Sequence, residues 1–217
     1  MDLILSIKNH PKRVKYFLAL FYAIGVIAIY IPFTASFFIS LTPITLLMSL
    51  GLLALYNAEN DTKTLLMFLF VFIAGYFIEV IGVNTGLIFG HYKYGETLGY
   101  KVFETPLMMG FNWVLMIYLT ASLSENIKTP AVVKVLMASA LMIVYDLVLE
   151  QFAPALDMWT WHKNNIPIQN YLAWFGVSLV FHSLLKAFRI KTINSLSVIV
   201  YLCQILFFLA LTFKFKI

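Results

Sequence analysis

Long apolar stretches separated by short polar segments are the main pattern along this chain. They predict spans at about residues 16–31, 37–56, 64–83, 106–123, 132–152, 170–188 and 193–213. Each stretch is close to the roughly 20 residues that a helix needs to cross a hydrocarbon layer of about 30 Å. The second span is the least regular, because Pro43 would stand in its first turns, where a missing backbone N–H is tolerated. The pattern predicts an all-α fold: a polytopic membrane helix bundle of about seven transmembrane helices, with residues 1–217 forming a single integral membrane domain.

Composition supports a membrane location. Hydrophobic residues make up 62% of the chain and charged residues 12%, and the mean hydropathy is +0.90. A soluble domain carries about a quarter of its residues as charged ones, so most of this surface faces lipid rather than water. The net charge of +5 comes from short tracts beside the apolar stretches. Such tracts report membrane topology rather than a nucleic-acid partner.

Counting basic residues on alternate sides predicts the orientation. Ten Lys and Arg residues fall on the side of the N-terminus: Lys8, Lys12, Arg13, Lys15, Lys63, Lys128, Lys134, Lys186, Arg189 and Lys191. Five fall on the other side: Lys93, Lys101, Lys163, Lys214 and Lys216. Cytoplasmic loops carry the excess of positive charge, so we expect a bacterial or archaeal cytoplasmic membrane with the N-terminus in the cytoplasm and the C-terminus outside. The two longest connections, 84–105 and 153–169, then share the non-cytoplasmic side.

Three acidic residues lie within the predicted spans. Glu79 is about one turn from the end of the third span, and Asp146 and Glu150 are in the last two turns of the fifth. The i, i+4 spacing of the latter two puts them on one helix face. Because like charges repel in a low dielectric, we expect at least one of the three to hold a proton at neutral pH, as general acid catalysis requires. The alternative is structural: Glu79 would bond to a neighbouring helix and the other two would be interfacial.

Polar and aromatic residues near the same end are candidate substrate contacts. They are Asn84, His91, Tyr94, Asn112, Trp159, Trp161, Asn170 and Trp174. Each has a simpler interpretation as well: the histidine can be structural, the tryptophans can form an aromatic belt, and the two asparagines at 112 and 170 can be helix caps or hold water. His182, in the middle of the sixth span, is typical of a hydrogen-bonded packing residue.

Several motifs are missing, and their absence narrows the function. The four histidines include no His-x-x-x-His pair, and no Asp-x-x-x-Asp pair or Gly-x-Gly-x-x-Gly turn occurs. These absences argue against a histidine-box di-iron site, a magnesium–diphosphate site and a bound dinucleotide. We therefore expect no metal and no cofactor. Two classes of function remain: acid–base chemistry on a lipid-soluble compound, and binding or transport.

Two longer segments resemble a known family. The first is residues 79–94, with Glu-Val-Ile-Gly-Val-Asn-Thr-Gly followed by Phe-Gly-His-Tyr-Lys-Tyr, and the second is residues 146–175, from Asp-Leu-Val-Leu-Glu through Trp-Thr-Trp to Asn-Tyr-Leu-Ala-Trp-Phe. In sequence and order they are similar to the integral-membrane carotenoid biosynthesis proteins, which include hydratases of γ-carotene, lycopene-type and bacterioruberin-type end groups. Gln151 departs from the proline expected there.

The resemblance implies a cofactor-independent carotenoid hydratase. Such an enzyme would protonate the terminal 1,2-double bond of an acyclic end group and let water capture the tertiary cation. It implies a carotenoid substrate in contact with membrane lipid, and other carotenoid-pathway enzymes as partners. Two alternatives stay open: a proton-initiated carotenoid or isoprenoid cyclase, and a non-enzymatic membrane binding or transport protein. The transport alternative would need polar residues at the membrane midplane, where mainly His182 and Gln204 qualify.

Overall fold

The structure, a computed structural model, describes residues 2–215, and this part of the chain is almost entirely α-helical. Its helices are α1 (Asp2–Lys8), α2 (Pro11–Tyr30), α3 (Pro32–Ser40), α4 (Thr42–Tyr56), α5 (Thr62–Thr85), α6 (Met108–Glu125), α7 (Ala131–Leu149), α8 (Ile168–Ala187) and α9 (Ser197–Phe215), with one 3-10 turn, η1 (His162–Asn164). Four short strands lie between them: β1 (Tyr92–Tyr94), β2 (Lys101–Val102), β3 (Thr105–Pro106) and β4 (Trp159–Trp161). The all-α prediction is confirmed. Lys216, one of the basic residues counted above, lies outside the described residues.

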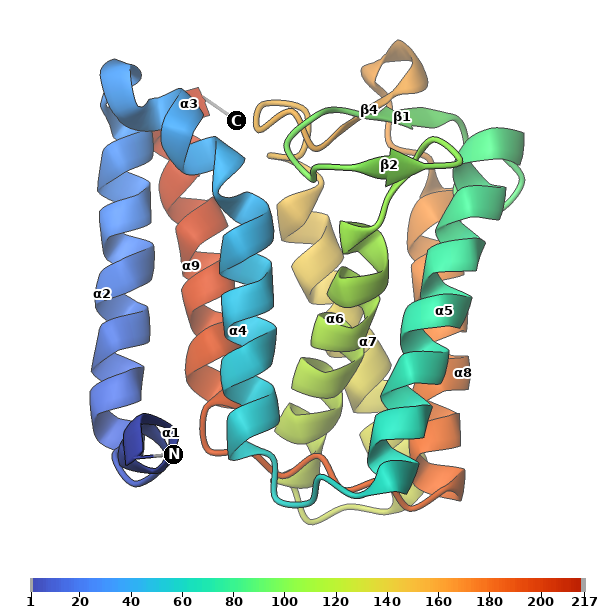
Figure 1. The fold of residues 1–217 in the computed structure, drawn as a ribbon. Helices are drawn as coiled ribbons and strands as arrows, with labels where there is room; N and C mark the ends of the chain where they lie inside the picture. The colour runs from blue at the N-terminus through green and yellow to red at the C-terminus, as the bar shows by residue number, and fades with distance from the viewer. Residues whose placement is uncertain (1, 216–217) are drawn as a thin grey trace.

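Helix α6 is the centre of the bundle. It packs against α4, α5, α7, α8 and α9, and all but three of its residues are buried. In Figure 1 the long helices run roughly side by side around it, and α2 with α9 forms the flank farthest from α5 and α8. The helices that meet at α6 can therefore bring side chains from distant parts of the sequence together.

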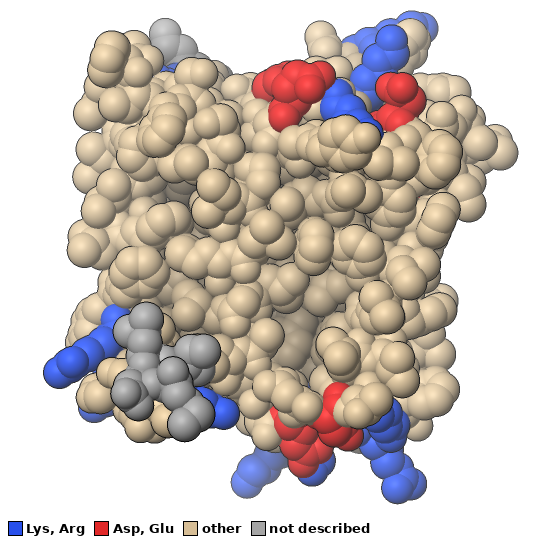
Figure 2. Space-filling view, in the orientation of Figure 1, with Lys and Arg blue, Asp and Glu red and all other residues tan. Residues whose placement is uncertain are grey.

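The surface of the bundle suits a membrane. Within residues 2–215 four helices are long and apolar enough to cross one, namely α2, α5, α7 and α9, and the pair α3–α4 would make a fifth if its two parts form one span. Figure 2 shows an uncharged band between two charged ends on the visible face. Helices α6 and α8 carry buried polar residues such as Asn112 and His182, which lowers their overall apolar character. The number of seven spans stays a prediction.

The second predicted span is broken in the structure. Helix α3 ends at Ser40 and α4 begins at Thr42, with a bend of 52° between them. Pro43 stands in the first turn of α4, so the predicted tolerance for it at a helix start is correct. The start of that helix, however, lies five residues later than residue 37. The other predicted spans match helices to within five residues at each end, and the largest difference is at the start of α2, which begins at Pro11 rather than at residue 16.

Short strands cover one end of the bundle, which we call the sheet end (residues 86–107 and 150–167). Strands β1 and β4 pair antiparallel, with Tyr92 opposite Trp161 and Tyr94 opposite Trp159. Strands β2 and β3 form a second small pair. The prediction that the connections 84–105 and 153–169 lie together is confirmed by the pairing of β1 with β4, which Figure 1 shows above the helices.

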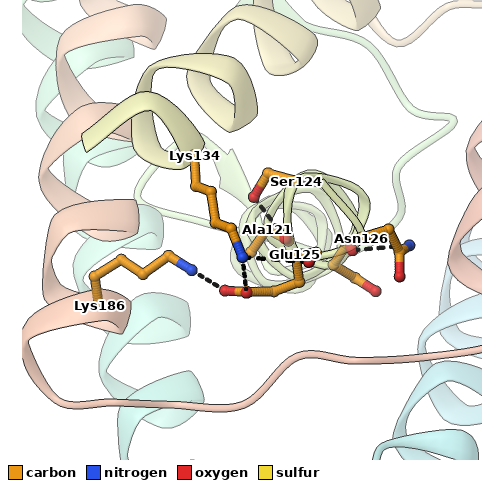
Figure 3. Close-up of polar contacts among 7 residues, drawn as sticks. Ala121, Ser124, Glu125, Asn126, Lys134 and Lys186 are labelled. Atoms are coloured by element: carbon orange, nitrogen blue, oxygen red, sulfur yellow. Dashed lines mark hydrogen bonds and ion pairs between the residues drawn. The ribbon is translucent and has the colours of Figure 1, made fainter. Parts of the chain in front are cut away.

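The opposite end, which we call the ion-pair end, holds a small charged cluster (Figure 3). Glu125, the last residue of α6, pairs with Lys134 of α7 through Oε2 at 2.8 Å and with Lys186 of α8 through Oε1. Lys134 also donates to the backbone carbonyl of Glu125 at 3.2 Å. All three side chains are partly exposed. The cluster ties three helices together where they end.

Candidate functional site

Glu79 occupies the middle of a closely packed section of α5. A Cβ atom added to Gly75, one turn earlier, would lie 2.6 Å from Cγ of Trp113. One added to Gly82 would lie 2.8 Å from Cε2 of Phe89. Only glycine leaves room for aromatic rings that close to the helix backbone. The two glycines therefore let large side chains of α6 and of the following loop surround Glu79, which is 2% exposed.

Three neutral donors bind the carboxyl group of Glu79. The hydroxyls of Tyr92 and Tyr94 donate to Oε2 at 2.8 and 2.7 Å. The indole N–H of Trp113 donates to Oε1 at 3.0 Å. Each carboxyl oxygen can accept about two hydrogen bonds, so Oε2 is fully used and Oε1 keeps one free position. That position is available for an acid proton.

Asp146 and Glu150 form a second carboxyl pair, at the end of α7. The side-chain amide of Asn170, in the first turn of α8, donates to Oδ2 of Asp146 at 3.0 Å and to Oε1 of Glu150 at 3.1 Å. Trp159 and Trp161 donate to Oε2 of Glu150 at 3.0 and 2.6 Å. Oδ1 of Asp146 is buried and has no partner. The prediction that the two acids share a helix face is confirmed by their common asparagine.

The pairing of β1 with β4 supplies most of these donors. Side chains alternate between the two faces of a strand, so Tyr92 and Tyr94 point inward while Lys93 between them is exposed. In β4 the same alternation buries Trp159 and Trp161. Burial, and after it the carboxyl of Glu79, raises the pKa of both tyrosines. Their hydroxyls therefore keep their protons and act as donors.

Two of the acids, Glu79 and Glu150, line a small cavity with aromatic walls, and Asp146 is joined to it through Asn170. The rest of the lining is Asn170 and seven aromatic or apolar side chains: Phe89, Tyr92, Tyr94, Met109, Trp159, Trp161 and Trp174. About 10 Å³ is left for the centre of a water molecule, which is about the space of a single water. Trp174 stacks on Trp113, with the ring centres 4.4 Å apart. We call the carboxyls of Glu79, Asp146 and Glu150, with this cavity, the acid cluster.

The charges of the acid cluster have no cationic partner. None of the ion pairs among the described residues includes Glu79, Asp146 or Glu150. Buried carboxyl groups without a cation are stable only with neutral donors or with a bound proton. The acid cluster has both the donors and, at Oε1 of Glu79, a place for the proton. This arrangement can give a proton to a substrate and take one back.

Three predicted contacts, Asn84, His91 and Asn112, lie outside the acid cluster. Asn84 donates to the backbone carbonyls of Val80 and Phe103, and His91 is exposed. Both line an open pocket of about 650 Å³ on the outer side of β1 and β4. Tyr92, Tyr94 and Trp161 line both this pocket and the acid-cluster cavity. The aromatic strand pair is thus a wall between the open pocket and the buried acids.

The alternative interpretation of Asn112 and Asn170 as helix caps is wrong. Helix α6 has Leu107 at its N-cap position and α8 has Pro167, so Asn112 and Asn170 stand inside their helices. Asn170 instead bridges two carboxyls, and Asn112 is buried in α6. His182 is a packing residue, as expected, because Thr120 and Ser139 bond to its two ring nitrogens.

Sequence reasoning missed two donors, Tyr92 and Trp113. The alternation in Tyr-Lys-Tyr, which matches that in Trp-Thr-Trp of β4, is the signal for Tyr92, but at three residues it is too short to identify a strand by itself. Trp113 gives no such signal. Its place beside Glu79 depends on how α5 and α6 pack.

Comparison with known proteins agrees with this geometry. The family model described as carotenoid biosynthesis protein matches residues 37–216. Bisanhydrobacterioruberin hydratase of Haloarcula japonica is 30% identical over 144 residues, which cover 60% of this chain and 47% of that protein. The chain therefore spans about half the length of this curated relative. No solved structure matches the chain. Because the matched residues make up most of the chain and include the whole acid cluster, this membrane protein belongs to the carotenoid biosynthesis protein family.

Proposed function

We propose that this protein is a carotenoid hydratase, which adds water across the terminal 1,2-double bond of an acyclic γ-carotene- or lycopene-like end group without a cofactor. The observation that carries the proposal is the acid cluster: three buried carboxyls with no cationic partner among residues 2–215, two of which line a cavity walled by aromatic rings. The family and the named hydratase relative support the same reaction class.

The first step is transfer of a proton to the end group. Glu79 is our candidate donor, because it lines the cavity and Oε1 has one free position. The proton bonds to the less substituted carbon of the double bond, whose electron pair forms the new C–H bond. The other carbon becomes a tertiary cation, and Tyr92 and Tyr94 stabilise the carboxylate that Glu79 leaves behind.

Capture of the cation by water completes the reaction. The oxygen of one water bonds to the cationic carbon and then loses a proton, which gives the tertiary alcohol. Glu150 or Asp146 accepts that proton, since the two share Asn170 and one of them can be ionised while the other is neutral. The proton then returns among the three acids to Glu79, so the overall change is the addition of one water.

Aromatic rings of the wall stabilise the cation between these steps. The faces of Trp and Tyr rings carry negative charge density and attract a cation within about 6 Å. Tyr94, Trp159, Trp161 and Trp174 line the cavity, and Trp113 stacks behind Trp174. Neutral rings stabilise the cation without forming a bond to it. A carboxylate in direct contact could instead quench the cation.

The alternatives make different demands on the site. A cyclase would use the same proton donor but would keep water away from the cation, so the mass of the product distinguishes the two reactions. A transporter would need a polar path through the bundle, and both nitrogens of His182 are already bonded to Thr120 and Ser139. The relative named as a hydratase favours hydration over both alternatives.

Expression in a host that accumulates lycopene or γ-carotene tests the proposal. We expect extracted pigments to gain the mass of one water for each end that reacts. An isomer of unchanged mass would indicate cyclisation, and unchanged pigment beside folded protein would contradict the proposal.

A further inference from the structure

A second cavity lies between α2, α3, α4 and α9, away from the acid cluster in the bundle. About 130 Å³ of it is open to the centres of water molecules, on the same measure as the cavity of the acid cluster. Its walls are almost wholly apolar, with Ile29, Phe38, Leu46 and Phe207 among them. Such a slot suits a flexible hydrocarbon chain.

Three polar side chains from three helices meet at this cavity. Tyr22 of α2 shares a hydrogen bond with Ser49 of α4 at 3.1 Å, and the amide nitrogen of Gln204 on α9 donates to the Tyr22 hydroxyl at 3.2 Å. All three residues are buried. Gln204 lines the cavity, and it is one of the two midplane polar residues that the sequence singled out.

The carbonyl oxygen of Gln204 has no partner. It is buried and accepts no hydrogen bond within the described residues, although Gln204 is only 3% exposed. An unpaired acceptor within the hydrocarbon depth of a membrane costs free energy, because no water replaces the missing donor. A ligand with an O–H group in the cavity would supply that donor.

From these observations we propose that the cavity between α2, α3, α4 and α9 binds a hydroxyl-bearing isoprenoid, with Gln204 Oε1 accepting the hydrogen bond of its hydroxyl. The apolar walls take the chain, and the unpaired carbonyl oxygen of Gln204 selects an alcohol over a hydrocarbon. Tertiary isoprenoid alcohols are also the product class of the proposed hydration. That link rests on the proposed function, whereas the binding itself does not.

The cavity also lies close to the acid cluster along the chain. Tyr145 and Met158 line it, and their neighbours in sequence are Asp146 and Trp159, which belong to the acid cluster or bond to it. Two segments, the end of α7 and the residues before β4, therefore contribute to both the cavity and the acid cluster.

Direct binding tests the proposal. The probe is isotope-labelled geranyllinalool, a tertiary isoprenoid alcohol, and its matched partner is the O-methyl ether, which keeps the oxygen but lacks the O–H donor. Binding is measured at equilibrium on purified, immobilised full-length protein in detergent, with detergent alone as the blank. One hydrogen bond to a neutral acceptor should make the alcohol bind roughly two- to tenfold more tightly than the ether.

Two variants locate the site. Gln204→Met keeps the length of the side chain and removes the acceptor, so alcohol and ether should bind equally. Gly25→Leu should weaken both, because Gly25 lines the cavity and a side chain there would fill it. Leu206→Met, at a lipid-exposed position of the same helix, is the control and should behave like the unaltered protein.

The outcomes separate this proposal from the proposed reaction. Glu79→Gln protein should bind the alcohol normally, even when it has lost hydration. Equal binding of alcohol and ether to the unaltered protein, or a preference that survives Gln204→Met, would overturn the proposal. So would probe retention no greater than that of detergent alone.

Discussion

At the ion-pair end Glu125 lies between Lys134 and Lys186, whereas at the sheet end Glu79, Asp146 and Glu150 are bound only by neutral side chains. Both groups of acids tie helices together. The first is partly exposed and electrically compensated. The second is buried and has no cation within the described residues.

The difference separates a structural role from a chemical one. Exposed or partly exposed ion pairs contribute about 0–1 kcal/mol to stability and leave both charges fixed. A buried carboxyl surrounded by neutral donors can change its protonation state, which a carboxyl held by two lysines cannot do as readily. If this comparison is right, changes at the two ends should have very different consequences for turnover.

Labelling from outside the membrane should distinguish the two ends of the bundle in an all-or-none way. In a Cys203→Ala background, we expect Lys93→Cys at the sheet end to react with a membrane-impermeant maleimide in intact spheroplasts. Lys128→Cys, exposed near the ion-pair end, should react only after permeabilisation. The reverse pattern would contradict the predicted cytoplasmic N-terminus, which rests on the excess of basic residues on that side.

Neutralising one acid at each end compares their roles directly. Glu79→Gln keeps the size of the side chain but removes the transferable proton, so hydration should fall by about a hundred- to ten-thousand-fold. Glu125→Gln should keep near-native turnover, because it changes only an ion-pair cluster. Pigment conversion per folded protein is the measurement. Near-native turnover of Glu79→Gln would move the donor role to Asp146.

Removing one neutral donor should have an intermediate effect. Tyr92→Phe deletes one of the two hydroxyls that donate to Oε2 of Glu79. A hydrogen bond to a charged group is worth about 1.5–3 kcal/mol, so turnover should fall by roughly ten- to a hundredfold. Tyr100→Phe, in the same connection but exposed, is the matched control. Equal activity of the two variants would mean that Tyr92 only packs.

The close approach of α5 and α6 should have a measurable effect on stability. Gly75→Ala places a methyl group against Trp113 and should lower the free energy of unfolding by about 1–3 kcal/mol. Gly51→Ala on α4 is the control, because nothing lies within 4 Å of the added Cβ, and it should be neutral or slightly stabilising. Thermal unfolding in detergent measures both. A Gly75 variant as stable as the control would show that α5 and α6 can move apart freely.

Much of the fold follows from the sequence because lipid imposes it. Apolar stretches of the required length predicted α5 and α7 to within a few residues, and Glu79, Asp146 and Glu150 stood out as the acids inside them. The break between α3 and α4 at Leu41 was not predicted, because Pro43 is also compatible with the first turns of one continuous helix. The sheet that covers the acids was missed as well, because three-residue strands give too short an alternation. Trp113 and Asn170 reach the acids only through packing of separate helices, which no local pattern encodes.

The most direct test of the proposed hydration follows the oxygen atom of water into the product. Purified protein, an acyclic carotenoid and water enriched in the heavy oxygen isotope are incubated with no added cofactor, and the product is analysed by mass spectrometry. The account predicts a tertiary alcohol that carries one heavy oxygen for each reacted end, and none from Glu79→Gln protein. An unlabelled alcohol, an isomer of unchanged mass, or full activity of Glu79→Gln would contradict it.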